Sequence, residues 1–112
     1  MNIEKFIENW IAASNAFDTK KYLSFYQPDA VLDDPSVGSK FEGHKGIQHY
    51  FDSYFIGYNT HTKQVKLKVI NVANAHLEVQ FTGNFPEGKI RGTFDFKFNG
   101  GKIALVRADL IH

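Results

Sequence analysis

The second half of the chain alternates apolar and polar side chains, and this period of two constrains the fold more than any other feature. Four such stretches between residues 61 and 111 are separated by turn signals, the clearest being Pro86-Glu87-Gly88 and Asn99-Gly100-Gly101. Asn and Gly tolerate the backbone conformations that tight hairpins require. The pattern therefore predicts consecutive antiparallel strands joined by hairpins.

The first half of the chain has the three- and four-residue spacing of helices. One apolar face is formed by Ile3, Phe6, Ile7, Trp10, Ala13 and Phe17. Asn2 and Asp18 are placed to cap the first helix and a short second one that ends by Pro28, and a third helix is expected to begin near Gly43. Helices followed by hairpins predict an α+β fold, with three N-terminal helices packed on one face of a curved, mostly antiparallel sheet.

Between the two halves lies Val31-Leu32-Asp33-Asp34-Pro35. Alternate residues of a strand share a face, so Asp34 points into the core if Leu32 does, and Asp33 points away. A carboxylate among aromatic rings is desolvated, which is typical of a general base. The alternative is an ordinary turn, in which Asp34 accepts hydrogen bonds from backbone N–H groups.

Composition narrows the class of protein. The 112 residues include 15% aromatic residues, enough to fill a bulky core or to line an apolar pocket. Basic and acidic residues nearly balance, at 13 and 12, which argues against nucleic acid as a partner. Cysteine is absent, and no apolar run approaches the ~20 residues that span a bilayer. The N-terminus lacks the pattern of a signal peptide. We expect one domain over residues 1–112, in a soluble cytoplasmic protein.

The order of these pieces resembles the nuclear transport factor 2-like superfamily, and within it the ketosteroid isomerase and SnoaL-like branch. The resemblance rests on residues 9–18, on Leu32-Asp33-Asp34-Pro35 with Gly38-Ser39, on Gly43-His44-Lys45-Gly46-Ile47, and on the hairpin at residues 96–103. It implies a cone-shaped α+β fold with a pocket between sheet and helices, often in a homodimer joined through the sheets.

Ketosteroid isomerase uses an Asp base with an oxyanion hole made by a Tyr and a protonated Asp. By resemblance the base falls on Asp34, the oxyanion Tyr on Trp10 and the oxyanion Asp on Phe94. Phenylalanine donates no hydrogen bond, and loss of one such donor costs about 2.7–4 kcal/mol of transition-state stabilisation. Steroid isomerisation is therefore expected to be weak or absent.

Strand parity and helix faces predict a pocket with Asp34 as its only interior carboxylate. The expected ligand-binding side chains are Trp10, Tyr26, Tyr50, Tyr54, Phe81, Phe94, Phe96, Ala108 and Leu110. The histidines lack metal-ligand spacing, so neither metal nor cofactor is expected.

Two functions stay open for this pocket. One is isomerase- or cyclase-type proton transfer by Asp34 on a small hydrophobic carbonyl compound. The other is non-catalytic binding of a small hydrophobic molecule, or dimerisation alone. The last strand predicts a homodimer, because Ile103, Leu105 and Ile111 share a face with Arg107 and Asp109.

Overall fold

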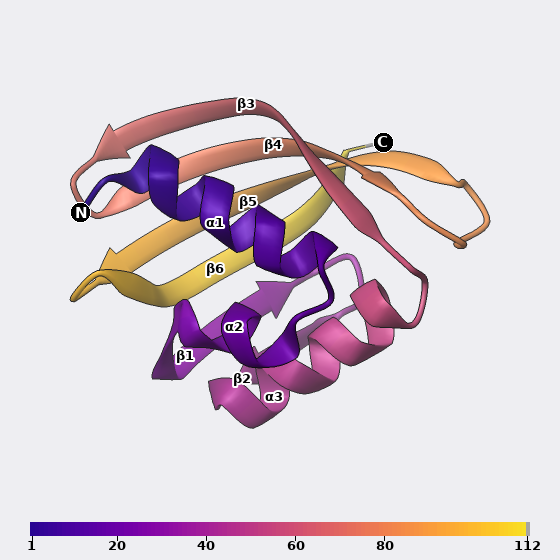
Figure 1. Ribbon diagram of the computed structural model, residues 1–112, viewed down its shortest axis with the longest axis horizontal. Coiled ribbons are helices and arrows are strands. Elements are labelled where there is room, and N and C mark those ends of the chain that lie inside the picture. Colours follow the sequence, from indigo (N-terminus) through magenta and orange to yellow (C-terminus); the bar gives the residue numbers. More distant parts are fainter. Residues whose placement is uncertain (112) are drawn as a thin grey trace.

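The computed structural model describes residues 1–111 (Figure 1). The helical elements are α1 (Ile3–Asn15), α2 (Thr19–Ser24), α3 (Gly43–Phe51) and the π-helical turn η1 (Asp52–Ile56). The strands are β1 (Tyr26–Asp34), β2 (Ser39–Glu42), β3 (His61–Asn71), β4 (Asn74–Thr82), β5 (Lys89–Asn99) and β6 (Lys102–Ile111). The expected α+β architecture is confirmed.

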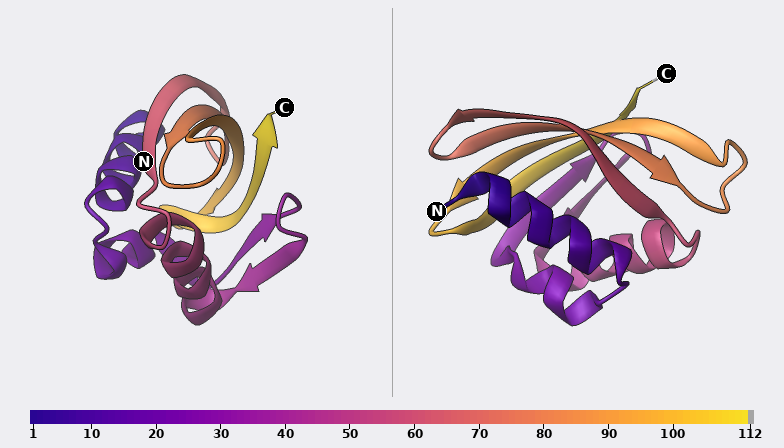
Figure 2. Two further views of the ribbon diagram at one scale, coloured as in Figure 1. Left: turned by 90° about the vertical axis from the view of Figure 1, so that its right-hand side faces the viewer. Right: turned by 45° about the horizontal axis from the view of Figure 1, so that its top comes forward.

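The strands form one six-stranded sheet in the order β2-β1-β6-β5-β4-β3. Every neighbouring pair is antiparallel except β1 and β6, which run parallel. The long strands curl, and the helices pack within the curve (Figure 2). Strand β2 was not predicted, because its four residues are mostly exposed and show no apolar alternation.

Local capping explains where the first two helices begin. The Asn2 side chain accepts a hydrogen bond from the Lys5 N–H at 3.0 Å, and Asp18 accepts one from the Lys21 N–H at 3.1 Å. Both predicted caps are confirmed. Helix α2 ends at Ser24, earlier than expected, and Pro28 lies inside β1.

Aromatic packing joins α1 to the sheet. Trp10 is fully buried and meets Phe94 and Phe96 edge-to-face, with ring centroids 5.0 and 5.2 Å apart. Phe94, Phe96 and Phe98 are all buried, whereas Asp95 lies on the outer surface beside His76. The predicted parity of β5 is confirmed.

Strand β6 departs from simple alternation. Its pairing with β5 shifts by one residue between Lys97 and Phe98, which marks a β-bulge. Ile103 is consequently fully buried, while Leu105 is 43% exposed. The expectation that Ile103 shares the outer face with Leu105 was wrong, because the extra residue of the bulge reverses the side on which Ile103 points.

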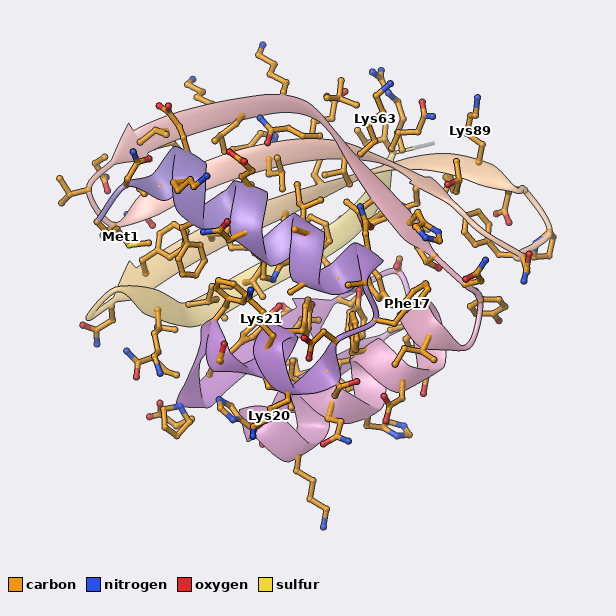
Figure 3. The ribbon with its side chains drawn as sticks, viewed as in Figure 1. Met1, Phe17, Lys20, Lys21, Lys63 and Lys89 are labelled. Atoms are coloured by element: carbon orange, nitrogen blue, oxygen red, sulfur yellow. The ribbon has the colours of Figure 1, made fainter. Side chains whose placement is uncertain are left out.

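Charged side chains gather on the outside. Lys20, Lys21, Lys63 and Lys89, which Figure 3 labels, are all exposed. No helix within residues 1–111 is long and apolar enough to cross a membrane.

Candidate functional site

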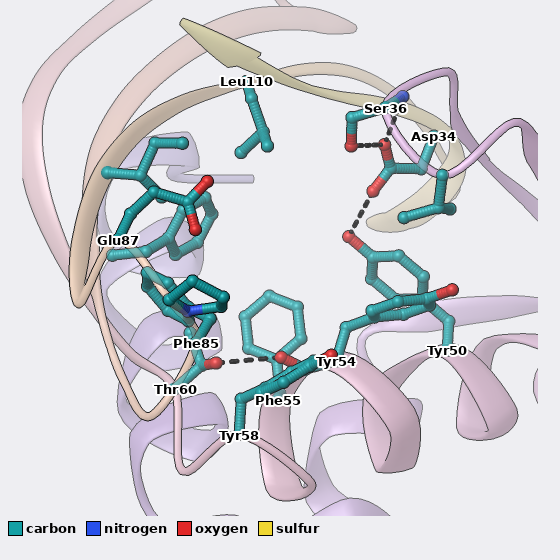
Figure 4. Close-up of a pocket in the computed structure, with 14 residues that line it drawn as sticks. Asp34, Ser36, Tyr50, Tyr54, Phe55, Tyr58, Thr60, Phe85, Glu87 and Leu110 are labelled. Carbon is teal, nitrogen blue, oxygen red and sulfur yellow. Dashed lines mark hydrogen bonds between the residues drawn. The ribbon is translucent and has the colours of Figure 1, made fainter. Parts of the chain in front are cut away.

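A cavity of about 260 Å³ opens where β1 ends, beside α3, η1 and the turn between β4 and β5 (Figure 4). Its wall is mostly aromatic and aliphatic, with carboxyl and hydroxyl groups at a few points. The lining residues are Asp34, Ser36, Val37, Tyr50, Tyr54, Phe55, Tyr58, Thr60, Phe81, Phe85, Pro86, Glu87, Ile90 and Leu110.

Strand β1 delivers Asp34 to this cavity. Leu32 is fully buried and Asp34 is 5% exposed, so they share the interior face, as strand parity predicts. Asp33 is only half-buried, on the opposite face. Pro35 follows directly, and the chain turns away from the sheet with the Asp34 carboxylate at the cavity wall.

Three donors hold the Asp34 carboxylate. Its Oδ1 accepts hydrogen bonds from the Ser36 N–H at 2.9 Å and from the Ser36 hydroxyl, and its Oδ2 accepts one from the Tyr50 hydroxyl at 2.9 Å. The bond from the Ser36 N–H closes the turn that the alternative interpretation of Asp34 predicts. Asp34 is thus both a turn residue and a cavity residue.

Tyr50 is a fixed donor in this arrangement. Burial raises the pKa of the Tyr50 hydroxyl well above its usual value of about 10, and the neighbouring negative charge of Asp34 raises that pKa further. The phenol therefore stays protonated through the neutral and mildly alkaline range, with its hydrogen directed at Oδ2.

Helix α3 and the π-helical turn place three aromatic rings together. Tyr50, Tyr54 and Phe55 lie four and five positions apart on this continuous segment. The ring centroids of Tyr50 and Tyr54 are 5.4 Å apart, and those of Tyr50 and Phe55 are 5.8 Å apart. A π-helical turn inside a helix is frequent at functional sites, and here it supplies two wall residues.

The predicted ligand-binding residues divide into two groups. Tyr50, Tyr54, Phe81 and Leu110 line the cavity together with Asp34. The other five lie outside the cavity lining, buried in the core: Trp10, Tyr26, Phe94, Phe96 and Ala108.

The indole of Trp10 explains why the cavity stops short of α1. Its N–H donates to the Tyr26 hydroxyl at 3.2 Å, and Tyr26 donates in turn to Tyr22 at 2.7 Å. The two oxyanion positions of the resemblance, Trp10 and Phe94, pack edge-to-face against each other. The indole N–H of Trp10 therefore already donates to a residue of the core. The space that an oxyanion would need is filled with aromatic rings.

Sequence reasoning missed several wall residues that lie in loops. Phe85, Pro86 and Glu87 belong to the turn between β4 and β5, and Tyr58 lies in the loop before β3. The turn signal at Pro86 was recognised, but alternation gives no direction to side chains outside strands. Glu87 is exposed, yet it brings a second carboxylate to a cavity expected to hold Asp34 alone.

Residues 7–106 match the sequence model of the SnoaL-like domain. The chain belongs to the SnoaL-like domain family. This match confirms the resemblance to the SnoaL-like branch, and solved structures described as ketosteroid isomerase-like and nuclear transport factor 2-like share the fold. Among curated proteins, none matches this SnoaL-like chain in sequence.

Solved structures share the fold of this SnoaL-like protein at low sequence identity. A candidate polyketide cyclase from Sinorhizobium meliloti superposes with a TM-score of 0.84 at 20% identity, covering 93% of both chains. A Catenulispora acidiphila protein of ketosteroid isomerase-like fold, in complex with trimethylamine, gives 0.81 at 14% identity, with coverages of 92% and 82%. A Mycobacterium tuberculosis protein in complex with estradiol-17beta-hemisuccinate gives 0.79 at 17% identity, with coverages of 92% and 88%.

Proposed function

We propose that this SnoaL-like protein binds a small, largely apolar organic molecule in the cavity beside Asp34. The observation that carries the proposal is a buried carboxylate, held by three donors, in an otherwise aromatic and aliphatic wall. Such a combination of apolar surface and few fixed polar groups is typical of ligand sites. The two fold relatives with bound trimethylamine and estradiol hemisuccinate support a role in binding small molecules.

The binding proposal is tested by filling the cavity. Leu110→Trp places a large ring into the lining, whereas Val72→Trp adds the same ring at a site that is 91% exposed, in the turn after β3. Both variants and the parent are titrated with a panel of small apolar ketones and arenes, and backbone amide shifts are followed by NMR.

We expect the parent and Val72→Trp to show shifts at the cavity residues, and Leu110→Trp to show none. A panel that shifts no cavity amide of the parent, or shifts those of Leu110→Trp equally, contradicts the proposal.

Proton transfer by Asp34 is the second candidate function. Its support is the place of the carboxylate at the cavity wall, where a carbonyl compound would contact it. The core positions of Trp10 and Phe94 argue against the oxyanion chemistry of steroid isomerisation, because neither presents a free donor to the cavity.

Exchange of the protons next to a carbonyl tests this second function. We expect Asp34→Asn to abolish any deuterium incorporation into a bound ketone, and Asp33→Asn, on the opposite strand face, to retain it. Equal rates in the two variants would remove Asp34 from the chemistry. Efficient isomerisation of a Δ5-3-ketosteroid by the parent would show that donors at positions other than 10 and 94 form an oxyanion hole.

A further inference from the structure

The charges of the cavity are of one sign. Two carboxylates, those of Asp34 and Glu87, lie in the lining, and no lysine, arginine or histidine is among the lining residues in the described part of the chain. Figure 4 shows the two carboxylates on opposite sides of the space. The lysines are instead exposed at the surface. The potential inside the cavity therefore favours a positive guest.

Asp34 lacks a cationic partner. Its three hydrogen bonds come from a backbone N–H and two hydroxyls, and none of the ion pairs found within residues 1–111 includes it. Buried charges in proteins are normally paired. A carboxylate also offers about four acceptor sites. Ser36 takes two on Oδ1 and Tyr50 takes one on Oδ2, which leaves one site on Oδ2.

The rings of the wall meet at steep angles. Phe55 and Phe81 are inclined at 83°, with centroids 5.8 Å apart, and Tyr58 and Phe85 at 78°, with centroids 6.3 Å apart. Rings set nearly at right angles present faces in different directions, as in the aromatic cages that receive alkylammonium groups. The negative face of each ring attracts a cation within about 6 Å of its centroid.

We propose that the cavity selects an organic cation, namely a protonated tertiary amine with small apolar substituents, whose single N–H donates to Oδ2 of Asp34. One ammonium hydrogen matches the one acceptor site that is left, and the substituents lie against the rings. Glu87 attracts the cation at the exposed side of the cavity. The inference deepens the proposed binding function and rests on it.

Three probes of nearly equal size and different charge test the proposal. N,N-dimethylbenzylamine is cationic at neutral pH, N,N-dimethylbenzamide is neutral and phenylacetate is anionic. Each is titrated to about 10 mM, where a ligand with a Kd near 1 mM approaches saturation, and NMR follows the amides of the cavity residues. We expect the amine to bind at least about tenfold more tightly than the amide, and phenylacetate to bind most weakly, because a hydrogen bond between oppositely charged groups is stronger than one between neutral groups.

Two variants separate the carboxylates, with Asp33→Asn as the matched control. We expect Asp34→Asn to weaken amine binding about tenfold or more and to leave dimethylbenzamide binding within about twofold. Glu87→Gln should remove most of the salt dependence of amine binding, because the field of an exposed charge is screened by salt. Asp33→Asn should bind all three probes as the parent does.

Each alternative outcome is decisive. Equal affinities for amine and amide, tighter binding of phenylacetate, or an unchanged amine affinity in Asp34→Asn overturn the proposal while leaving small-molecule binding in place. If Asp34→Asn does not fold, two other measurements decide whether the cavity selects a cation. These are the order of the three affinities in the parent and the salt dependence of amine binding in Glu87→Gln. If no probe shifts a cavity amide, selection of a cation is wrong, and the ketone and arene titration decides the broader binding function separately.

Discussion

At the scale of single residues, the decisive contact is the hydrogen bond between Tyr50 and Asp34. Asp34 is 5% exposed and Tyr50 is 4% exposed, so water replaces neither partner readily. The raised pKa of Tyr50 keeps its hydrogen in place. The two side chains therefore form one polar unit in an apolar wall, and this unit sets where a polar group of a ligand lies.

Tyr50→Phe tests that unit. The substitution keeps the ring and removes the donor to Oδ2, so we expect the free energy of unfolding to fall by about 1–3 kcal/mol. Tyr54→Phe is the matched control, since no hydrogen bond of the Tyr54 hydroxyl occurs among the described residues, and should change stability by less than about 0.5 kcal/mol. Urea unfolding measures both. Equal losses in the two variants would contradict the role assigned to Tyr50.

At the scale of secondary structure, two irregularities shape the molecule. The π-helical turn η1 continues α3 and brings Tyr54 and Phe55 to the cavity. The bulge in β6 turns Ile103 into the core, although regular alternation from Leu105 would leave it outside. Both features add one residue to a regular repeat, and both move side chains from the position that the repeat predicts.

A pair of truncations on β6 measures the effect of the bulge. Ile103→Ala creates a cavity in the core and should cost about 2–5 kcal/mol. Leu105→Ala removes a side chain that is 43% exposed and should cost less than about 1 kcal/mol. Urea unfolding of both variants at one low protein concentration gives the comparison. Similar losses would mean that Ile103 and Leu105 share a face after all.

At the scale of the whole molecule, three tyrosine side chains are buried. Burial raises the pKa of Tyr22 and of Tyr26, and burial together with the charge of Asp34 raises that of Tyr50. In the unfolded chain these groups ionise near pH 10, whereas the folded chain keeps their protons at higher pH. The stabilising contribution is complete below about pH 10 and is lost as the pH rises from there toward the folded pKa values.

We therefore expect a steep alkaline loss of stability. Each buried tyrosine adds up to about 1.4 kcal/mol per pH unit above pH 10. Tyr22→Phe should reduce this slope by the share of one group. Between about pH 7 and 9, the free energy of unfolding of this variant should stay close to its own value at pH 7. Urea unfolding at a series of pH values measures the slope. An identical slope in Tyr22→Phe would show that Tyr22 ionises normally in the folded chain.

The outer face of the sheet carries the prediction of a homodimer. Leu105 and Ile111 are 43% and 39% exposed, although Ile103 no longer contributes to this face. Apolar side chains grouped on a sheet are typical of an interface. Light scattering should give a dimer mass for the parent at micromolar concentration and a lower mass for Leu105→Lys. A monomer mass for the parent would exclude the dimer.

Local sequence patterns were enough to predict the fold class and the interior position of Asp34. Helical spacing in the first half and alternation in the second are local consequences of the backbone repeat, and both survive in the structure because apolar faces must be buried. Alternation along the strand predicted that Asp34 shares the interior face with Leu32. The helix caps at Asn2 and Asp18 follow from local hydrogen bonds.

The extent of the cavity and its charge depend instead on contacts between distant segments of the chain. Alternation gives the face on which a side chain lies, but the depth of a cavity depends on which rings from distant segments fill the space. Trp10 packs against Phe94 and fills the space under α1. The cavity lining therefore includes Tyr50 but neither Trp10 nor Phe94. Glu87 enters the wall from a turn, and Ile103 moves inward at a bulge. These positions follow from chain paths that no local repeat contains.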